Sequence, residues 1–192
     1  MKKQRQLSLF VERRMNLPNY ITLARVVMIP FFVNFMIYGY FGAALTVFVA
    51  ACVTDALDGM IARLTNQKTE LGAFLDPMAD KLLIVAAFVT LVLLGMLPVW
   101  LVIIVVSRDI ILVLGSVVIY FTGHEFKARP SLIGKATTVL QLLVVVLSLF
   151  LEYLGTKMML MPVLMWTTAI FTIASGIQYV SRGTKIVGQD PK

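Results

Sequence analysis

Residues 26–54 read VVMIPFFVNFMIYGYFGAALTVFVAACVT and contain no Asp, Glu, Lys or Arg. A helix needs about 20 mostly apolar residues to span a membrane, so this run is long enough to hold parts of two spans. The cluster YGYFG (38–42) interrupts it with glycines typical of a turn. The run is continuous rather than alternating, which predicts two membrane helices and not the strands of a barrel.

The rest of the chain repeats this pattern. Of its 192 residues, 59% are hydrophobic and 14% charged, and the mean hydropathy is +0.90. This composition argues against a disordered chain and against a soluble globular domain. Further uncharged runs cover 82–107, 110–123, 136–151 and 158–181. We therefore predict an all-α integral membrane protein with six transmembrane helices, at residues 18–38, 42–63, 72–95, 98–121, 133–152 and 158–181.

The positive charges are unevenly distributed between the two sides of this arrangement. The loops expected on one side carry a single positive charge, that of Lys157. The loops and tails expected on the opposite side carry twelve: Lys2, Lys3, Arg5, Arg13, Arg14, Lys68, Lys127, Arg129, Lys135, Arg182, Lys185 and Lys192. By the positive-inside rule, both termini are expected in the cytoplasm. The net charge of +7 is then explained by topology and by contact with anionic lipid head groups, and we expect no nucleic-acid partner.

The chain divides into three parts. Residues 1–17 are an N-terminal segment, and LSLFVERRMNLPN (7–19) is expected to lie along the membrane interface as a short amphipathic helix. Residues 18–183 form the membrane domain, and residues 184–192 form a cytoplasmic tail.

Four aspartates follow the first uncharged run, within DALDGMIARLTNQKTELGAFLDPMADK (55–81). Asp55 and Asp58 are three residues apart near the end of the second predicted span, and Asp76 and Asp80 are four apart near the start of the third. Each pair projects from one helix face, and the short connection lets the two pairs face each other. Such carboxylates repel unless cations neutralise them, which predicts a site for Mg²⁺ or Mn²⁺, most simply two ions. The alternative is that these aspartates cap helix ends and are solvated by water, without binding a metal.

The residues between the pairs suit a ligand site. Gly59, Gly72 and the small Ala62 let a ligand approach the helix backbone, and Arg63 supplies a cation for phosphate or for a carboxylate. Gly59 and Ala62 can equally be helix-packing residues. Zinc is not expected, because His124 is the only His and the sequence has no Cys/His cluster.

A second group of charges lies further along the chain. Arg108 interrupts a predicted span beside Asp109, and Arg129, Ser131 and Lys135 lie near the start of the fifth span. An arginine within a membrane is costly and is usually functional, so these residues are candidates for a basic pocket that binds a phosphate group. Two alternatives remain open: Arg108 forms a structural pair with an aspartate, and Lys135 snorkels to the surface.

Asp55, Asp58, Gly59, Ala62, Arg63, Gly72, Asp76 and Asp80 complete the pattern D-x2-D-G-x2-A-R-x8-G-x3-D-x3-D. This pattern resembles the signature of the CDP-alcohol phosphotransferases. The resemblance extends from about Asn16 to Gly183, and NLPNYITLARVVMIP (16–30) and DPMADKLL (76–83) are similar to the branch that makes phosphatidylglycerophosphate or cardiolipin.

The resemblance implies transfer of a phosphatidyl group from CDP-diacylglycerol to an alcohol, with release of CMP. It implies that Asp55, Asp58, Asp76 and Asp80 are metal ligands and that Asp80 is also the general base. It further implies that the cytidine diphosphate borders Asp58, Gly59, Ala62, Arg63 and Gly72, with Asn19 and Thr22 nearby. The resemblance also suggests a homodimer. A bacterial inner membrane is the expected location, and the positive-inside rule places the site on its cytoplasmic face.

In such a reaction the basic pocket of Arg108, Arg129, Ser131 and Lys135 is expected to bind a phosphate of the acceptor alcohol. The identity of that alcohol is less clearly indicated. Phosphatidylglycerophosphate synthases commonly show G-K-x-K-T-x2-Q, whereas GKATTVLQ (134–141) has Thr137 in place of the second lysine. SRDIILVLG (107–115) also lacks an expected leucine-arginine pair, and both departures resemble cardiolipin synthases. We place glycerol 3-phosphate first, as the commoner activity for chains of this length, and phosphatidylglycerol second. A divalent-cation transporter is a third hypothesis, which the position of the aspartates at helix ends, rather than at the bilayer midplane, disfavours.

Overall fold

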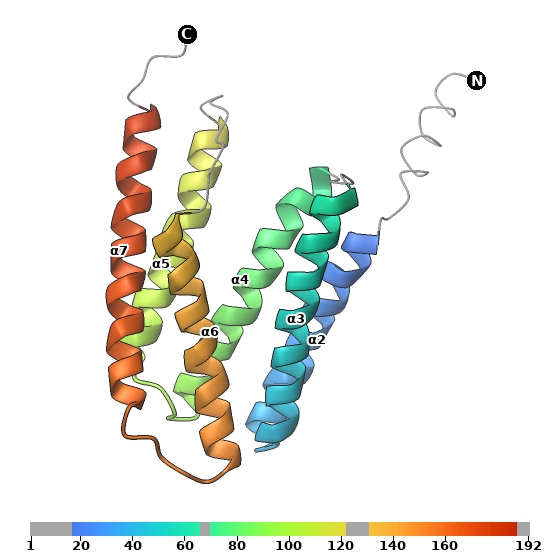
Figure 1. Cartoon of the computed structure of the whole chain (residues 1–192), viewed down its shortest axis with the longest axis vertical. Coiled ribbons are helices and arrows are strands. Elements are labelled where there is room, and N and C mark those ends of the chain that lie inside the picture. Colours follow the sequence, from blue (N-terminus) through green and yellow to red (C-terminus); the bar gives the residue numbers. More distant parts are fainter. Residues whose placement is uncertain (1–16, 66–69, 122–130, 188–192) are drawn as a thin grey trace, which may run out of the picture.

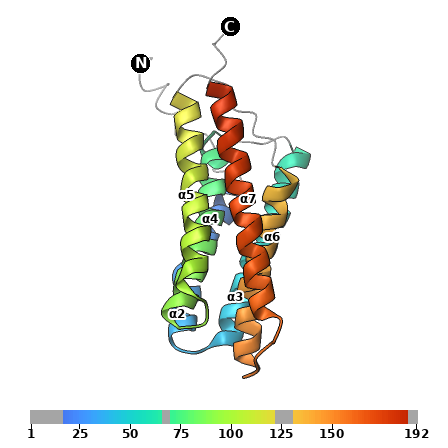
Figure 2. The same cartoon turned by 90° about the vertical axis from the view of Figure 1, so that its left-hand side faces the viewer.

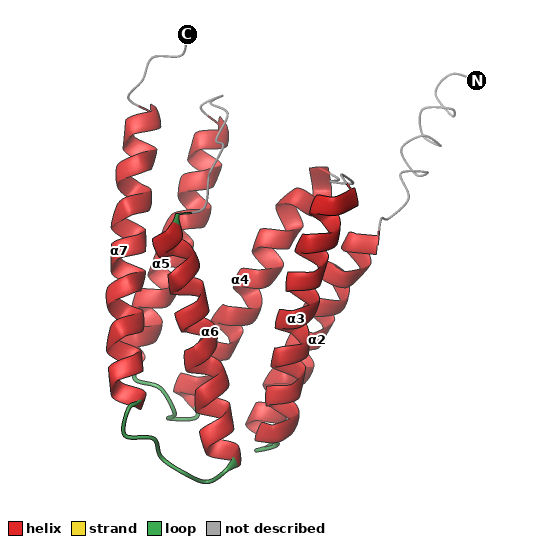
Figure 3. Ribbon diagram, in the orientation of Figure 1, coloured by secondary structure: helices red, strands yellow, loops and turns green. Residues whose placement is uncertain are grey.

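The computed structural model describes residues 17–65, 70–121 and 131–187, and within these residues the chain is helical, with no strand (Figure 3). Six helices follow one another: α2 (Leu17–Ile37), α3 (Phe41–Thr65), α4 (Glu70–Leu93), α5 (Val99–Phe121), α6 (Leu132–Tyr153) and α7 (Met161–Val187). This confirms the all-helical prediction. The predicted interfacial segment, residues 1–17, lies outside the described residues except for Leu17.

The helices alternate in direction, so that α2 begins and α7 ends at the same end of the bundle (Figure 1). We call this the terminal end; α3 and α5 also end there, and α4 and α6 begin there. α2 packs against both α3 and α4, while α7 packs against both α5 and α6. α4 and α6 connect the two groups, since α4 contacts α5 and α6, and α6 contacts α3. Figure 2 shows α5 and α7 side by side.

The three connections at the opposite end close in the same way. Gly39, Gly95 and Gly155 each follow a helix with positive φ angles of 76°, 74° and 64°. In each case the next residue donates its N–H to a carbonyl five residues earlier, as in Tyr40 to Phe35 at 2.8 Å and Met96 to Leu91 at 2.9 Å. This is the Schellman closure, in which glycine tolerates the left-handed conformation that satisfies the last carbonyls of the helix. The turn predicted at YGYFG (38–42) is confirmed.

Apolar side chains lie both inside and outside the bundle. The interior contains fully buried aromatic and aliphatic residues such as Phe32, Phe48, Phe88 and Leu101. Outside, α7 exposes an apolar stripe at alternating steps of three and four residues: Val163, Trp166, Ile170, Ile173, Ile177 and Val180. In the described part of the chain, Leu132–Tyr153 and Met161–Ser181 are long and apolar enough to cross a membrane. A helix with apolar residues on its outer face suits lipid rather than water, which supports a membrane protein.

The helix boundaries agree with those predicted to within a few residues, with the largest differences in α7. That helix begins at Met161 rather than at residue 158, because Pro162 favours the first turn of a helix, where its missing N–H costs nothing. It also continues past Ser181 to Val187, with Thr184 bonded back to the Ser181 carbonyl. Hydropathy marks where a chain leaves the bilayer, whereas a helix can continue into water.

Candidate active site

The two aspartate pairs lie at matching depths below the terminal end. α3 ends at Thr65 and α4 begins at Glu70, so the two helix ends lie close together (Figure 1). With a rise of 1.5 Å per residue, Asp58 and Asp76 each lie about 10 Å from these ends, and Asp55 and Asp80 about 15 Å. The backbone thus carries the four residues to two common levels. The side chains of Asp58, Asp76, Asp80, Ala62 and Arg63, and the surroundings of Gly59 and Gly72, lie outside what the structure describes.

Of the four aspartates, Asp55 is the one whose side chain the structure describes. Its Oδ1 lies 2.8 Å from Nη2 of Arg25, which comes from α2. The Asp55 side chain is 42% exposed, whereas that of Arg25 is 1% exposed. The charged guanidinium therefore approaches the carboxylate from inside the bundle, and the carboxylate keeps an open side.

Arg25 was not among the residues that we predicted for the site. The available signal was an arginine placed immediately before an uncharged run of 29 residues, which is an unusual position unless the charge has a buried partner. Asn19 and Thr22, predicted near the nucleotide, lie in the two turns of α2 before Arg25 and so closer to the terminal end. Their side chains lie outside the described set.

A second polar site, which we call the Arg108 cluster, consists of Lys81, Arg108, Asp109 and Ser175. Lys81 Nζ and Arg108 Nη1 both contact Asp109 Oδ1, at 2.8 and 2.7 Å. Arg108 Nη2 donates to the Ser175 hydroxyl at 3.1 Å. The side chains of Arg108 and Asp109 are 8% and 4% exposed. The pairing of Arg108 with Asp109 confirms the ion pair considered above, and among the described residues two cations, Lys81 and Arg108, contact the same carboxylate oxygen.

The start of α6 lies against this cluster. Ser131 caps the helix, since its hydroxyl accepts a hydrogen bond from the Gly134 N–H at 3.0 Å. A Cβ at Gly134 would lie 3.2 Å from Ser131 Oγ, 3.6 Å from Ser175 Oγ and 3.8 Å from Arg108 Nη2. Gly134 is therefore the point at which these three polar groups meet. The N-terminus of a helix favours anions, and here it adds to the charge of a buried guanidinium.

The predicted acceptor residues are thus only partly brought together. Arg108 and Ser131 meet around Gly134, whereas Lys135 is exposed and Arg129 lies outside the described residues. Lys81 and Ser175 join the cluster without having been predicted. Ser175 comes from α7 and lies in the apolar run IASGIQYV, where a lone serine gives no signal in the sequence.

Thr137 occupies the position at which a lysine is common in phosphatidylglycerophosphate synthases. It is fully buried between α6 and α7, and its hydroxyl donates to the carbonyls of Ile133 at 2.8 Å and Phe171 at 3.0 Å. One turn further along, the Gln141 amide donates to Thr172 Oγ1 at 3.4 Å. Thr137 and Gln141 therefore join the two helices and do not add charge to the Arg108 cluster.

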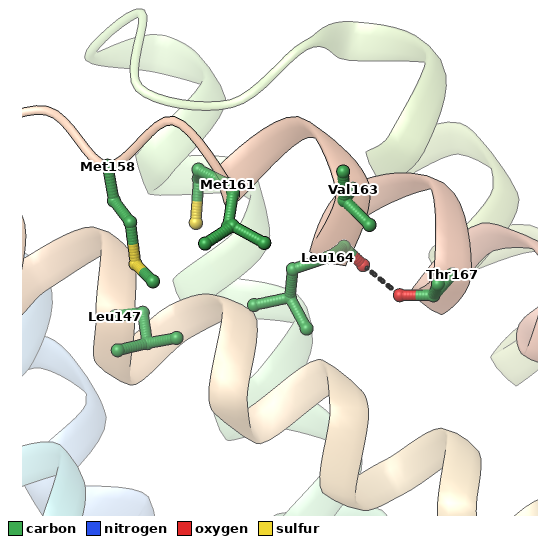
Figure 4. Close-up of a pocket in the computed structure, with 7 residues that line it drawn as sticks. Leu147, Met158, Met161, Val163, Leu164 and Thr167 are labelled. Atoms are coloured by element: carbon green, nitrogen blue, oxygen red, sulfur yellow. Dashed lines mark hydrogen bonds between the residues drawn. The ribbon is translucent and has the colours of Figure 1, made fainter.

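An apolar pocket lies near the opposite end of α6 and α7 (Figure 4). It is lined by Leu147, Met158, Leu160, Met161, Val163, Leu164 and Thr167. Its one hydroxyl, that of Thr167, bonds to the Leu164 carbonyl at 2.9 Å. The pocket offers no charged group to a phosphate and is separate from the two polar sites.

The two polar sites are linked through α4, because Lys81 of the Arg108 cluster directly follows Asp80. The Asp55 carboxylate is accessible and is held by the guanidinium of Arg25. Carboxylate oxygens are the ligands that Mg²⁺ and Mn²⁺ prefer, so Asp55 fits the expected metal. Among the side chains that the structure describes, no group of three His, Cys, Asp or Glu gathers, since only Asp55 of the four aspartates is included.

Comparison with known proteins agrees with this chemistry. The CDP-alcohol phosphatidyltransferase family model matches residues 15–174. A Bacillus subtilis protein named CDP-diacylglycerol–glycerol-3-phosphate 3-phosphatidyltransferase is 35% identical over 87% of this chain and 94% of its own length. A probable phosphatidylglycerophosphate synthase of Mycobacterium tuberculosis is 36% identical, over 90% and 84%. The human cardiolipin synthase (CMP-forming) is 33% identical, over 92% and 64%. The chain therefore belongs to the CDP-alcohol phosphatidyltransferase family.

Proposed function

We propose that this protein transfers the phosphatidyl group of CDP-diacylglycerol to sn-glycerol 3-phosphate and releases CMP, giving phosphatidylglycerophosphate. The names of the Bacillus subtilis and Mycobacterium tuberculosis relatives support this reaction. The observation that carries it is the linkage of two sites through α4: the aspartates of the family signature lie on α3 and α4 within about 15 Å of the terminal end, and Lys81, next to Asp80, is ion-paired into the buried cluster of Arg108.

In the reaction the acceptor hydroxyl attacks the phosphorus on the lipid side of the pyrophosphate. A new P–O bond forms, the bond to CMP breaks, and Asp80 takes the proton of the hydroxyl. Two Mg²⁺ or Mn²⁺ ions, held by Asp55, Asp58, Asp76 and Asp80, would hold the pyrophosphate and neutralise charge on the leaving CMP; members of the family generally depend on a divalent metal. Asn19, Thr22, Asp58, Gly59, Ala62, Arg63 and Gly72 would border the cytidine diphosphate.

The acceptor phosphate would bind at the Arg108 cluster and the start of α6, with contributions from Ser131, Lys135 and Arg129. A guanidinium has five N–H donors, and the described contacts of Arg108 use two of them, one to Asp109 and one to Ser175. Its buried Nε has no hydrogen-bond partner among the described residues. Donors therefore remain for an anion, and the helix terminus favours the same charge.

The membrane setting completes the proposal. Six spans with both termini in the cytoplasm would place the terminal end, and so both polar sites, at the cytoplasmic face of a bacterial inner membrane. There the nucleotide is in water while the acyl chains of the donor remain in the bilayer. Residues 1–17 would lie on the membrane, 18–183 in it and 184–192 in the cytoplasm, and the protein would act as a homodimer.

Phosphatidylglycerol is the second candidate acceptor, which would make the protein a cardiolipin synthase. Thr137 favours it, because a lysine side chain at this position would extend back toward Gly134 and add a charge to the Arg108 cluster. A phosphodiester acceptor carries one negative charge, whereas a phosphomonoester carries roughly −1.5 to −2, so a site with one cation fewer suits the phosphodiester better.

One incubation tests the proposal. Purified protein, CDP-diacylglycerol and Mg²⁺ are mixed with glycerol 3-phosphate or with phosphatidylglycerol, and the lipid product is identified by mass. We expect phosphatidylglycerophosphate in the first mixture; cardiolipin in the second mixture alone would select the second candidate. Absence of CMP in both, with uptake of Mn²⁺ into sealed proteoliposomes, would overturn the enzyme in favour of the transporter.

A further inference from the structure

Arg25 is the most buried charged side chain among the described residues that the reaction does not yet use. It comes from α2, which contributes none of the four aspartates, and it is 1% exposed. An arginine stays charged at any accessible pH, so its burial requires a compensating anion. The carboxylate of Asp55, with Oδ1 at 2.8 Å from Nη2, supplies that charge across the α2–α3 contact.

The contact also restricts the orientation of Asp55. One oxygen faces a guanidinium fixed inside the bundle, while the 42% exposure of the side chain shows that the carboxylate has an accessible side. A metal ion would therefore bind Asp55 on the side away from Arg25. The Asp55 carboxylate can therefore lie between two cations, with the Arg25 guanidinium on its buried side and a divalent ion on its accessible side.

We propose that Arg25 is a positioning residue for the metal site: it holds Asp55 from behind, so that the carboxylate presents its accessible side to the divalent ion. This inference rests on the proposed metal site at the aspartates. Carboxylates that ligate metals are usually held by such partners, and loss of the partner typically weakens metal affinity about 10–100-fold.

The opposite role makes the opposite prediction. If Arg25 were only a counter-ion that occupies Asp55 until metal displaces it, removal of Arg25 would relieve competition and strengthen metal binding. If Arg25 served the fold alone, removal would lower thermal stability and leave metal affinity unchanged. The metal affinity of the protein itself, measured without turnover, therefore separates the three roles.

The experiment is a Mn²⁺ titration of the purified full-length protein in detergent, in which the EPR signal of free Mn²⁺ reports binding. We expect Arg25→Gln to raise the Kd for Mn²⁺ about 10–100-fold. Arg25→Lys keeps the charge but loses the planar fork, so it should recover part of this loss. Gln141→Leu is the control: it removes another fully buried polar side chain, which bonds Thr172 between α6 and α7, and should leave the Kd for Mn²⁺ unchanged.

Each other outcome overturns the inference. An equal or lower Kd in Arg25→Gln would mean that Arg25 does not position Asp55 for metal. Should this variant not give a monodisperse, folded protein, Arg25→Lys decides, and an unchanged Kd in it counts against the inference. If the unaltered protein does not bind Mn²⁺, both the proposed metal site and the role of Arg25 are wrong. If the unaltered protein binds Mn²⁺ and Arg25→Gln binds it equally well, only the role of Arg25 is wrong.

Discussion

The two polar sites of this protein differ in how the chain builds them. The aspartates come from a single stretch of 26 residues on two successive helices, and the sequence reveals them as a regular pattern. The Arg108 cluster draws Lys81 from α4, Arg108 and Asp109 from α5, and Ser175 from α7, and it touches the start of α6. A site made of neighbours in sequence can be recognised before the fold is known, whereas a site made of four helices becomes visible only when they pack.

The difference is also chemical. The aspartate pattern places four carboxylates on two successive helices, whereas in the described part of the Arg108 cluster two cations, Lys81 and Arg108, contact one carboxylate, that of Asp109. A divalent metal and a phosphate-bearing acceptor would complete the two sites. We therefore expect perturbation of the aspartate site to abolish turnover, and perturbation of the Arg108 cluster to weaken recognition of the acceptor.

Removal of metal should have the largest effect. Excess EDTA is expected to reduce CMP release below detection, because carboxylates alone would repel the pyrophosphate, and Mg²⁺ or Mn²⁺ in excess of the chelator should restore it. The measurement is CMP formation from CDP-diacylglycerol, with the thermal transition of the detergent-solubilised protein recorded before and after. Undiminished turnover in EDTA would contradict the metal site.

Asp80→Asn should come next, with a loss of about 10³-fold or more in CMP release, since a general base contributes roughly 10²–10⁴-fold and Asp80 is also a proposed ligand. Elution as a single folded species in size-exclusion chromatography would show that the fold is intact. Glu152→Gln makes the same acid-to-amide change at an exposed residue of the opposite end and should leave turnover unchanged. Near-normal turnover in Asp80→Asn would rule out the base.

Much of the fold could be predicted from the sequence because each signal is local. Uncharged runs indicate the helices, and Gly39, Gly95 and Gly155 end three of them with closures that only the adjoining residues make. The packing of the helices could not be predicted. A helix that faces lipid on one side and protein on the other is apolar all round, so its sequence pattern does not show which face is buried. The contacts of α2 with α4 and of α7 with α5 therefore could not be predicted.

The same limit explains what was missed at the sites. Asp55 could be predicted from its spacing to Asp58, but its partner Arg25 lies 30 residues earlier and depends on the α2–α3 contact. Arg108 could be predicted because an arginine is rare within a span, but its hydrogen bond to Ser175 joins residues 67 positions apart. For Thr137, the sequence showed an absent lysine, whereas the structure shows a buried hydroxyl that joins α6 to α7.

Substitution of Arg108 should have an intermediate effect. Arg108→Ala is expected to raise the KM for the acceptor about 10–100-fold, because a hydrogen bond to a charged group contributes roughly 1.5–3 kcal/mol, while the KM for CDP-diacylglycerol changes less. Arg108→Lys, which keeps the charge without the bidentate geometry, should lie between. The measurement is initial rates at varied acceptor and at varied donor. A defect confined to the donor would count against the Arg108 cluster as the acceptor site.

The smallest effect is expected for Ser175, whose hydroxyl accepts from Arg108 Nη2 at 3.1 Å. Ser175→Ala leaves the charge of the Arg108 cluster unchanged and removes one hydrogen bond, so the acceptor KM should rise only about 2–10-fold, and the donor KM should not change. Ser148→Ala is the matched control, since Ser148 is a buried serine of α6 whose hydroxyl has no hydrogen-bond partner in the described part of the chain. If both variants behave alike, the contact with Arg108 is only packing. If Ser175→Ala alone affects the acceptor, then α7, a helix without any residue of the family signature, takes part in acceptor recognition.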